Sequence, residues 1–104
     1  MEYHKLVRDG IPAIIASKGE KYVARVAGDE EFIEKLKEKL KEEVAEFIAD
    51  PDPEELADIY EVLDTLIKTM SMDKTAILAE QQRKRKERGG FDGKIILESS
   101  EQKK

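Results

Sequence analysis

The segment from residue 41 to residue 66 constrains the fold more than any other stretch of this 104-residue chain. Two stretches with helical periodicity flank the sequence Asp-Pro-Asp-Pro at residues 50–53, where two prolines interrupt a continuous helix. So short a connection predicts that the two helices fold back on each other as an antiparallel hairpin. The expected fold class is therefore mainly α, a helical bundle built around this hairpin.

Acidic residues occupy the faces of both helices where apolar residues are expected. At about 100° per residue, Glu43 points into the apolar arc of the first helix and Glu46 lies at its edge. On the second helix, Glu55 lies inside one margin of the apolar face and Asp58 lies just beyond it. The hairpin brings Glu46 level with Glu55 and Glu43 level with Asp58, so four carboxylates are predicted to converge. The apolar residues that define the two faces are Phe32, Ile33, Leu36, Leu40 and Phe47 on the first helix, and Leu56, Ile59, Tyr60, Val62, Leu63, Leu66, Ile67 and Met70 on the second.

Two interpretations of these acids are open from helical geometry alone. Unpaired carboxylates are costly to bury, so they either take up protons or bind a cation, and an all-oxygen cluster on facing helices suits a hard divalent ion such as Mg²⁺. Alternatively, Asp52, Pro53 and Glu55 form the N-cap, N1 and N3 positions of a capping box. Acid pairs are also common by chance, because 41% of the residues are charged.

Composition narrows the class of protein. A chain of 104 residues is expected to form a single domain over residues 1–104, and so small a domain buries only part of its surface, which favours a homodimer or larger homo-oligomer. Zero cysteines exclude disulfides and thiolate metal sites and fit a cytoplasmic location. The N-terminus has no apolar run, so neither a signal peptide nor a membrane span is expected. A net charge of −5 argues against binding to nucleic-acid polymers.

Further helices and helix boundaries are predicted from local sequence signals. Asp9, with a proline in the first turn, is expected to open a short helix that stops near Gly19. Asp29 is expected to cap the first long helix. The second long helix should reach about Met72, and a third should run over residues 74–88 and end at a Gly-Gly pair.

Outside the helices, two short segments are β-prone. Residues 22–26 are one strand candidate, and residues 94–97 form a second that could pair with them. The tail from about residue 99 is expected to fray.

The last part of the third helix carries a run of basic residues that includes Arg83, Lys84 and Arg88. Basic residues in a last helical turn commonly complement the helix dipole and remain solvated. They could instead supply positive charge to a triphosphate, as could Lys5 and Arg8 near the N-terminus. Which of these five residues face a site cannot be derived from spacing.

The combination of motifs resembles the MazG-like, all-α nucleoside triphosphate pyrophosphohydrolases, a group that includes the phosphoribosyl-ATP pyrophosphohydrolases. The family pattern E-E-x-x-E on one helix and E-x-x-D on the next is matched by residues 42–46 and 55–58. The sequences K-L-V-R-D-G-I-P at residues 5–12 and R-K-E-R-G-G-F at residues 85–91 are similar to a compact branch of that group. Together these motifs extend over nearly the whole chain.

The resemblance implies that Glu43, Glu46, Glu55 and Asp58 bind Mg²⁺, with Mn²⁺ as a substitute. It further implies hydrolysis of a nucleotide between the α- and β-phosphates, with release of a nucleoside monophosphate and pyrophosphate. Glu43 or Glu46 would accept the proton of the attacking water. The implied fold is a helical bundle that is commonly dimeric. The candidate phosphate contacts are Lys5, Arg8, Arg83, Lys84 and Arg88.

One departure from the family concerns the connection between the helices, because only eight residues separate Glu46 from Glu55. A short hairpin leaves little loop to shape a base pocket within one subunit, so the nucleotide stays open. House-cleaning of non-canonical triphosphates is one role for such an enzyme. Glu61 or Asp64 could assist, although the helical angle turns Glu61 toward solvent.

Two alternative functions are consistent with the same residues. The first is the phosphoribosyl-ATP reaction of histidine synthesis, which uses the same metal chemistry on a different substrate. The second belongs to another class, a non-catalytic helical interaction module in which the acids are caps and solvated charges.

Overall fold

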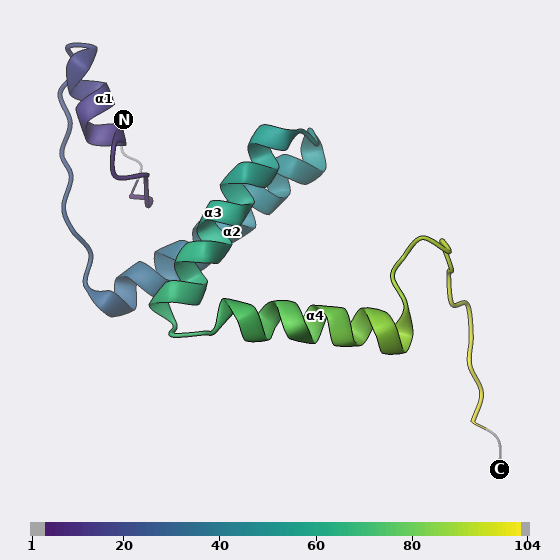
Figure 1. Ribbon diagram of the computed structural model, residues 1–104. Helices are drawn as coiled ribbons and strands as arrows, with labels where there is room; N and C mark the ends of the chain where they lie inside the picture. The colour runs from purple at the N-terminus through teal and green to yellow at the C-terminus, as the bar shows by residue number, and fades with distance from the viewer. Residues whose placement is uncertain (1–3, 103–104) are drawn as a thin grey trace. The chain divides into compact units, whose positions relative to one another are not determined.

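The computed structural model describes residues 4–102, and this part of the chain contains four α-helices and no strand (Figure 1). The mainly α fold class is therefore confirmed, whereas the MazG-like arrangement stays a prediction. None of the described helices is long and apolar enough to cross a membrane. The helices are α1 (Ile11–Ser17), α2 (Asp29–Ala49), α3 (Pro53–Thr69) and α4 (Lys74–Arg88).

The chain divides into two compact units, Met1–Met72 and Asp73–Lys104. The first unit is organised by α2 and α3, which pack side by side as the predicted antiparallel hairpin (Figure 1). The second unit consists of α4 and the segment that follows it. The expectation of one domain over the whole chain stays a prediction.

The turn of the hairpin is held by a helix cap. Asp52 is the N-cap of α3, and its carboxylate accepts a hydrogen bond of 2.8 Å from the backbone N–H of Glu55. Pro53 occupies the first helical position, where its missing N–H is not needed. On the other side of the turn, the backbone N–H of Asp50 donates to the carbonyl of Glu46 and ends α2. These local interactions fix the point at which α3 starts and so its register against α2.

The core between the two helices is thin. Among residues 4–102, only Leu36, Glu43 and Val62 are buried, with 2%, 5% and 7% of their surfaces exposed. The remaining apolar residues predicted for α2 are half-buried, which confirms the inward face of that helix. On α3 the outer side of the apolar stripe is exposed, as shown by Tyr60 with 66% of its surface accessible. The exposed members of that stripe are Leu56, Tyr60, Leu63 and Met70.

Three predicted helix boundaries differ from the structure by one to three positions. Gly10 and Gly28, rather than the neighbouring aspartates, are the N-caps of α1 and α2, and neither cap involves a side-chain hydrogen bond. Asp29 instead lies in the first turn of α2, where its charge favours the positive end of the helix. Helix α3 ends at Thr69, not near Met72.

Both boundaries of α4 agree with the prediction. The carboxylate of Asp73 accepts hydrogen bonds from the backbone N–H groups of Thr75 and Ala76 and caps the start of α4. Gly89 follows the last residue with a φ angle of +85°, a conformation that glycine adopts without steric cost.

The predicted pairing of residues 22–26 with residues 94–97 is wrong, because neither segment forms a strand in the structure. A two-stranded pair is only marginally stable in water unless other elements cover one face. Here the side chains of Val23, Val26 and Ile95 are almost fully exposed, so no packing supports such a pair. Residues 99–102 also lie outside any helix or strand, and the end of the predicted fraying tail lies outside the described residues.

The N-terminal segment, defined here as residues 4–9, is tied to both helices of the hairpin. The Lys5 ammonium lies 3.3 Å from a carboxylate oxygen of Glu42 on α2. The Arg8 guanidinium lies 2.7 Å from Asp58 on α3. In addition, the Lys35 ammonium on α2 donates a hydrogen bond of 2.9 Å to the backbone carbonyl of His4. These contacts hold the segment against the side of the hairpin that carries the acidic residues.

Candidate metal centre

Three of the four predicted carboxylates come together between α2 and α3. Glu43, Glu55 and Asp58 each offer one oxygen atom, and these three atoms lie within 4.8 Å of one another. Glu43 comes from the C-terminal half of α2, and the other two come from the first two turns of α3. Their convergence follows from the register that the Asp52 cap gives the hairpin.

Glu43 is the buried member of this triad. It lies two turns along α2 from Leu36, so the same face of the helix that presents a core leucine also presents a carboxylate. One of its oxygens, Oε1, is 3.3 Å from the ammonium of Lys39, one turn earlier. The other oxygen, Oε2, is buried and has no hydrogen-bond partner among the described residues. An unsatisfied buried carboxylate oxygen is costly and therefore marks a place where a cation fits.

Glu55 is half-buried, and its Oε2 also lacks a hydrogen-bond partner among the described residues. Desolvation raises the pKa of Glu55 to about 7, and the nearby carboxylates of Glu43 and Glu46 act in the same direction. In a complete capping box the Glu55 side chain would return to the N-cap backbone. In this cap the backbone N–H of Glu55 donates to the carboxylate of Asp52, whereas Oε2 of the Glu55 carboxylate takes no part in the cap.

Glu46 lies beside the triad and not within it. Its side chain is exposed, and it is not part of the group of oxygens that lie within 4.8 Å. It is nevertheless close enough that its negative charge contributes to the raised pKa of Glu55. A direct role for Glu46 in metal binding or in catalysis stays a prediction.

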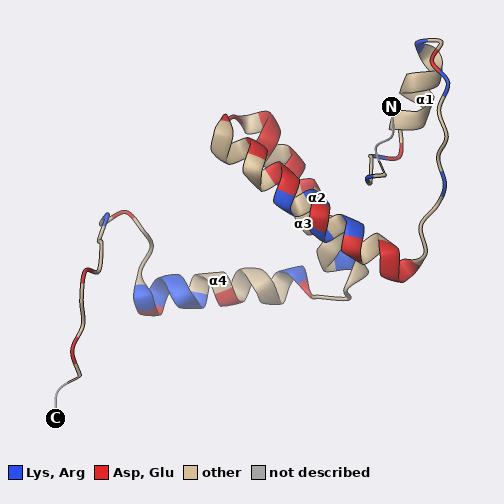
Figure 2. Cartoon of the chain, turned by 180° about the vertical axis from the view of Figure 1, so that it is seen from behind, with Lys and Arg blue, Asp and Glu red and all other residues tan. Residues whose placement is uncertain are grey.

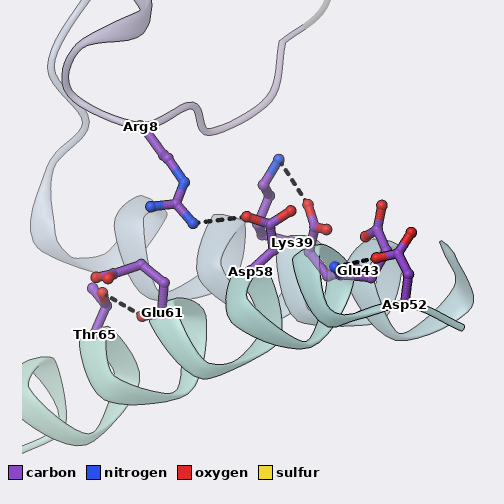
Figure 3. Close-up of polar contacts among 8 residues, drawn as sticks. Arg8, Lys39, Glu43, Asp52, Asp58, Glu61 and Thr65 are labelled. Carbon is purple, nitrogen blue, oxygen red and sulfur yellow. Dashed lines mark hydrogen bonds and ion pairs between the residues drawn. The ribbon is translucent and has the colours of Figure 1, made fainter. Parts of the chain in front are cut away.

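Basic side chains approach the acids from the open side (Figure 3). Arg8 pairs with Asp58 at 2.7 Å, and Lys39 pairs with Glu43 at 3.3 Å. Lys39 was not among the predicted phosphate contacts. Its spacing of four residues before Glu43 places the two side chains on the same helical face and is the signal that would have identified it. Two triad members thus have a cationic neighbour, although Oε2 of Glu43 has none.

A cavity of about 630 Å³ opens beside the triad and is lined by two of its members, Glu43 and Asp58. Two of the predicted phosphate contacts, Lys5 and Arg8, line it together with Lys39. Glu61 is exposed, as its helical angle predicts, yet it also lines this cavity. The connection between the two helices supplies no residue to this cavity, and the N-terminal segment forms its other wall.

The predicted phosphate contacts on α4 have surroundings of their own in the second unit, where Lys and Arg gather on the C-terminal part of the helix (Figure 2). The Arg83 guanidinium is held within its helix by Glu80 and by Glu87, the latter at 2.7 Å. These ion pairs fit the interpretation of Arg83 as solvated surface charge. Lys84 is exposed, and Arg88 lines a small cavity of about 230 Å³ with Phe91 and neighbouring residues.

The donor set of the triad fits a hard divalent cation. All three groups are carboxylates, which Mg²⁺, Mn²⁺ and Ca²⁺ prefer over nitrogen or sulfur ligands. Mg²⁺ holds oxygen ligands at about 2.0–2.1 Å, so opposite ligands of one ion lie about 4.1 Å apart. The spacing of the triad is comparable, and the two unpartnered oxygens belong to two of its members. The triad can therefore bind a metal ion.

Comparisons of the chain with models of protein families, with curated proteins and with solved structures give no match. The resemblance to the MazG-like group therefore rests on the motifs in the sequence. The function has to be argued from the chemistry of the site.

Proposed function

We propose that this protein is a Mg²⁺-dependent nucleotide pyrophosphohydrolase, which adds water across the bond between the α- and β-phosphates of a nucleoside triphosphate. The products are a nucleoside monophosphate and pyrophosphate. Mn²⁺ is the expected substitute for Mg²⁺. The homodimer implied by the family resemblance and the cytoplasmic location inferred from the absence of cysteine belong to the same proposal.

The observation that carries this proposal is the pair of buried, unpartnered carboxylate oxygens on Glu43 and Glu55, which converge with Asp58. Two members of this triad, Glu43 and Asp58, line a cavity that Lys5, Arg8 and Lys39 also line. A helical module that serves only as a binding surface has no need of a carboxylate in its core. Buried charge of this kind destabilises a fold unless a cation compensates for it. A phosphate substrate supplies a reason to keep both the acids and the cations.

The chain's own residues divide the chemical tasks between them. When bound, the metal ion would neutralise phosphate charge and make a coordinated water more acidic. Glu43 or Glu46 accepts the proton of the attacking water, as a carboxylate near the reacting atoms can do. Arg8 and Lys39 donate hydrogen bonds to phosphate oxygens, and the planar fork of Arg8 suits two oxygens at once.

The test is a panel of nucleoside triphosphates and phosphoribosyl-ATP, incubated with the purified protein and Mg²⁺, with release of pyrophosphate as the measurement. Glu43→Gln should abolish hydrolysis, because it removes a metal ligand while it keeps the shape of the side chain. Its melting temperature without metal should be equal or higher, since a buried charge has been removed.

Glu54→Gln is the matched control, because it removes an exposed carboxylate from the first turn of the same hairpin helix that carries Glu55. This variant should hydrolyse substrate at the parent rate. Parent-like activity of Glu43→Gln would contradict the proposed site. If the melting temperature is the same with and without Mg²⁺ or Mn²⁺, and no substrate is hydrolysed, the non-catalytic interaction module is favoured instead.

A further inference from the structure

The cavity beside the triad is elongated along the hairpin. Its wall on α2 contains Phe32, Leu36, Lys39 and Glu43, which recur every three or four residues on one helical face. Its wall on α3 contains Asp58, Glu61, Val62 and Thr65, with the same periodicity. Because the helices are antiparallel, the trough runs from Glu43 and Asp58 at one end to Phe32 and Thr65 at the other. At 1.5 Å per residue, the α2 wall spans roughly 16 Å.

The two ends of this trough differ in chemistry. Carboxylates and their cationic neighbours Arg8 and Lys39 occupy the end near the triad. The walls beyond them carry apolar side chains, with Phe32 and Val62 from the hairpin and Ile11 from α1, and also the polar Glu61 and Thr65. Figure 3 shows Glu61 and Thr65 further along α3 from Asp58. A ligand that fills the trough therefore needs a charged end and a less polar end with a few hydrogen-bonding groups.

We propose that the trough is the subsite for the nucleoside part of the substrate, and that Glu61 determines which nucleosides it accepts. This inference rests on the proposed function, since it assumes that phosphates occupy the end near the triad. The half-buried ring of Phe32 offers an apolar surface to the base or the sugar. The N-terminal segment closes the trough with Leu6 and Val7, which makes a long hairpin loop unnecessary.

Glu61 and Thr65 limit the chemistry of the ligand along the α3 wall of the trough. An ionised carboxylate only accepts hydrogen bonds. The hydroxyl of Thr65 donates its proton to the backbone carbonyl of Glu61 at 2.8 Å, so its free lone pairs are also acceptors. The ligand must therefore bring donors, and a carboxylate receives two adjacent donors best. Nucleosides present such a pair in two places, the vicinal hydroxyls of ribose and the N1–H and amino edge of guanine.

The experiment measures equilibrium binding of the α,β-methylene analogues of GTP, dGTP, ATP and dATP in the presence of Mg²⁺. The parent protein should discriminate by about tenfold, a ratio that corresponds to about one hydrogen bond to a charged group. A preference for both ribonucleotides identifies the sugar hydroxyls as the recognised pair, and a preference for both guanine nucleotides identifies the base edge. Glu61→Gln should reduce that ratio to about onefold to threefold, because an amide offers one acceptor and places a donor beside it.

The readout is a ratio of affinities, so a general change in charge does not affect it. Removal of one negative charge strengthens binding of all four analogues alike, and thermal melting verifies that each variant is folded. Glu54→Gln, the exposed control on α3, should keep the parent ratio. Equal affinities in the parent, an unchanged ratio in Glu61→Gln, or no binding of any analogue would overturn the subsite.

Hydrolysis of the four natural nucleotides, measured in parallel, separates this proposal from the proposed function. If the protein hydrolyses nucleotides but Glu61→Gln leaves its preference between them unchanged, the proposed enzymatic function stands and the proposed subsite is wrong. If the protein binds the analogues selectively but hydrolyses none of the nucleotides, the proposed subsite stands and the proposed enzymatic function is wrong.

Discussion

Replacement of Arg8 by glutamine should have opposite effects on the binding of metal and of nucleotide. The guanidinium lies 2.7 Å from Asp58, one of the three candidate ligands. A metal ion that binds the same carboxylate has to compete with this ion pair. Arg8→Gln removes the competitor, so the metal should bind more tightly. The phosphates of a nucleotide lose a cationic partner in the same variant, so the nucleotide should bind less tightly.

The size of the first effect follows from the exposure of the ion pair. The side chains of Arg8 and Asp58 are 56% and 38% exposed, so water screens their attraction. Ion pairs of this kind contribute about 0.2–1 kcal/mol, which limits the expected gain in metal affinity to about fivefold. The loss of nucleotide affinity should be larger, about tenfold or more, because hydrogen bonds to charged groups contribute about 1.5–3 kcal/mol.

The assay is a titration of the metal-free protein with Mn²⁺. Binding is measured by calorimetry or by the relaxation rate of water protons. The matched control is Lys5→Gln, which removes another cation of the N-terminal segment. Its partner is Glu42, a residue outside the triad, so metal affinity should stay close to that of the parent. Equal or weaker Mn²⁺ binding in Arg8→Gln would refute the competition for Asp58. An unchanged Michaelis constant for the triphosphate would refute the contact with phosphate.

Three further predictions concern pH, the basic end of α4 and self-association. The pKa of Glu55 is about 7 in the folded protein and near 4.5 when it is unfolded, so the folded state holds the extra proton between these values. The metal-free protein should therefore lose thermal stability as the pH rises from about 4.5 to 7, and Glu55→Gln should flatten that dependence. Arg88→Ala should raise the Michaelis constant for a triphosphate by about tenfold, ~1.4 kcal/mol, with little change in melting temperature, whereas Lys86→Ala in the same last turn should match the parent; equal kinetics in both variants would leave Arg88 as solvated charge. Light scattering at micromolar concentration should give at least a dimer, and Tyr60→Glu on the exposed apolar side of α3 should shift it toward a mass of 11.9 kDa; a parent that already has this mass would contradict self-association.

Local chemistry explains why much of the hairpin was predictable from sequence. The 3.6-residue period indicated which faces of α2 and α3 meet, and Leu36 and Val62 are indeed the buried apolar residues. Asp52 and Pro53 act within one helical turn, so their roles as cap and first helical residue depend on nothing distant. The same period placed Glu43 in the core. Periodicity on two helices and the length of one turn were sufficient to predict the convergence of three of the four acids.

Contacts between residues far apart in the chain were decided only by the tertiary structure. Helical angle describes a residue relative to its own axis, so it assigned Glu61 to solvent and could not show that the N-terminal segment builds a cavity beside it. The pairing of Arg8 with Asp58 spans 50 positions and has no local signature. Residues 22–26 have β-propensity, but a strand forms only where a neighbouring segment supplies hydrogen bonds, and none of the described residues does so. Periodicity thus determined which faces of this chain are apolar or acidic, whereas packing determined which distant residues meet those faces.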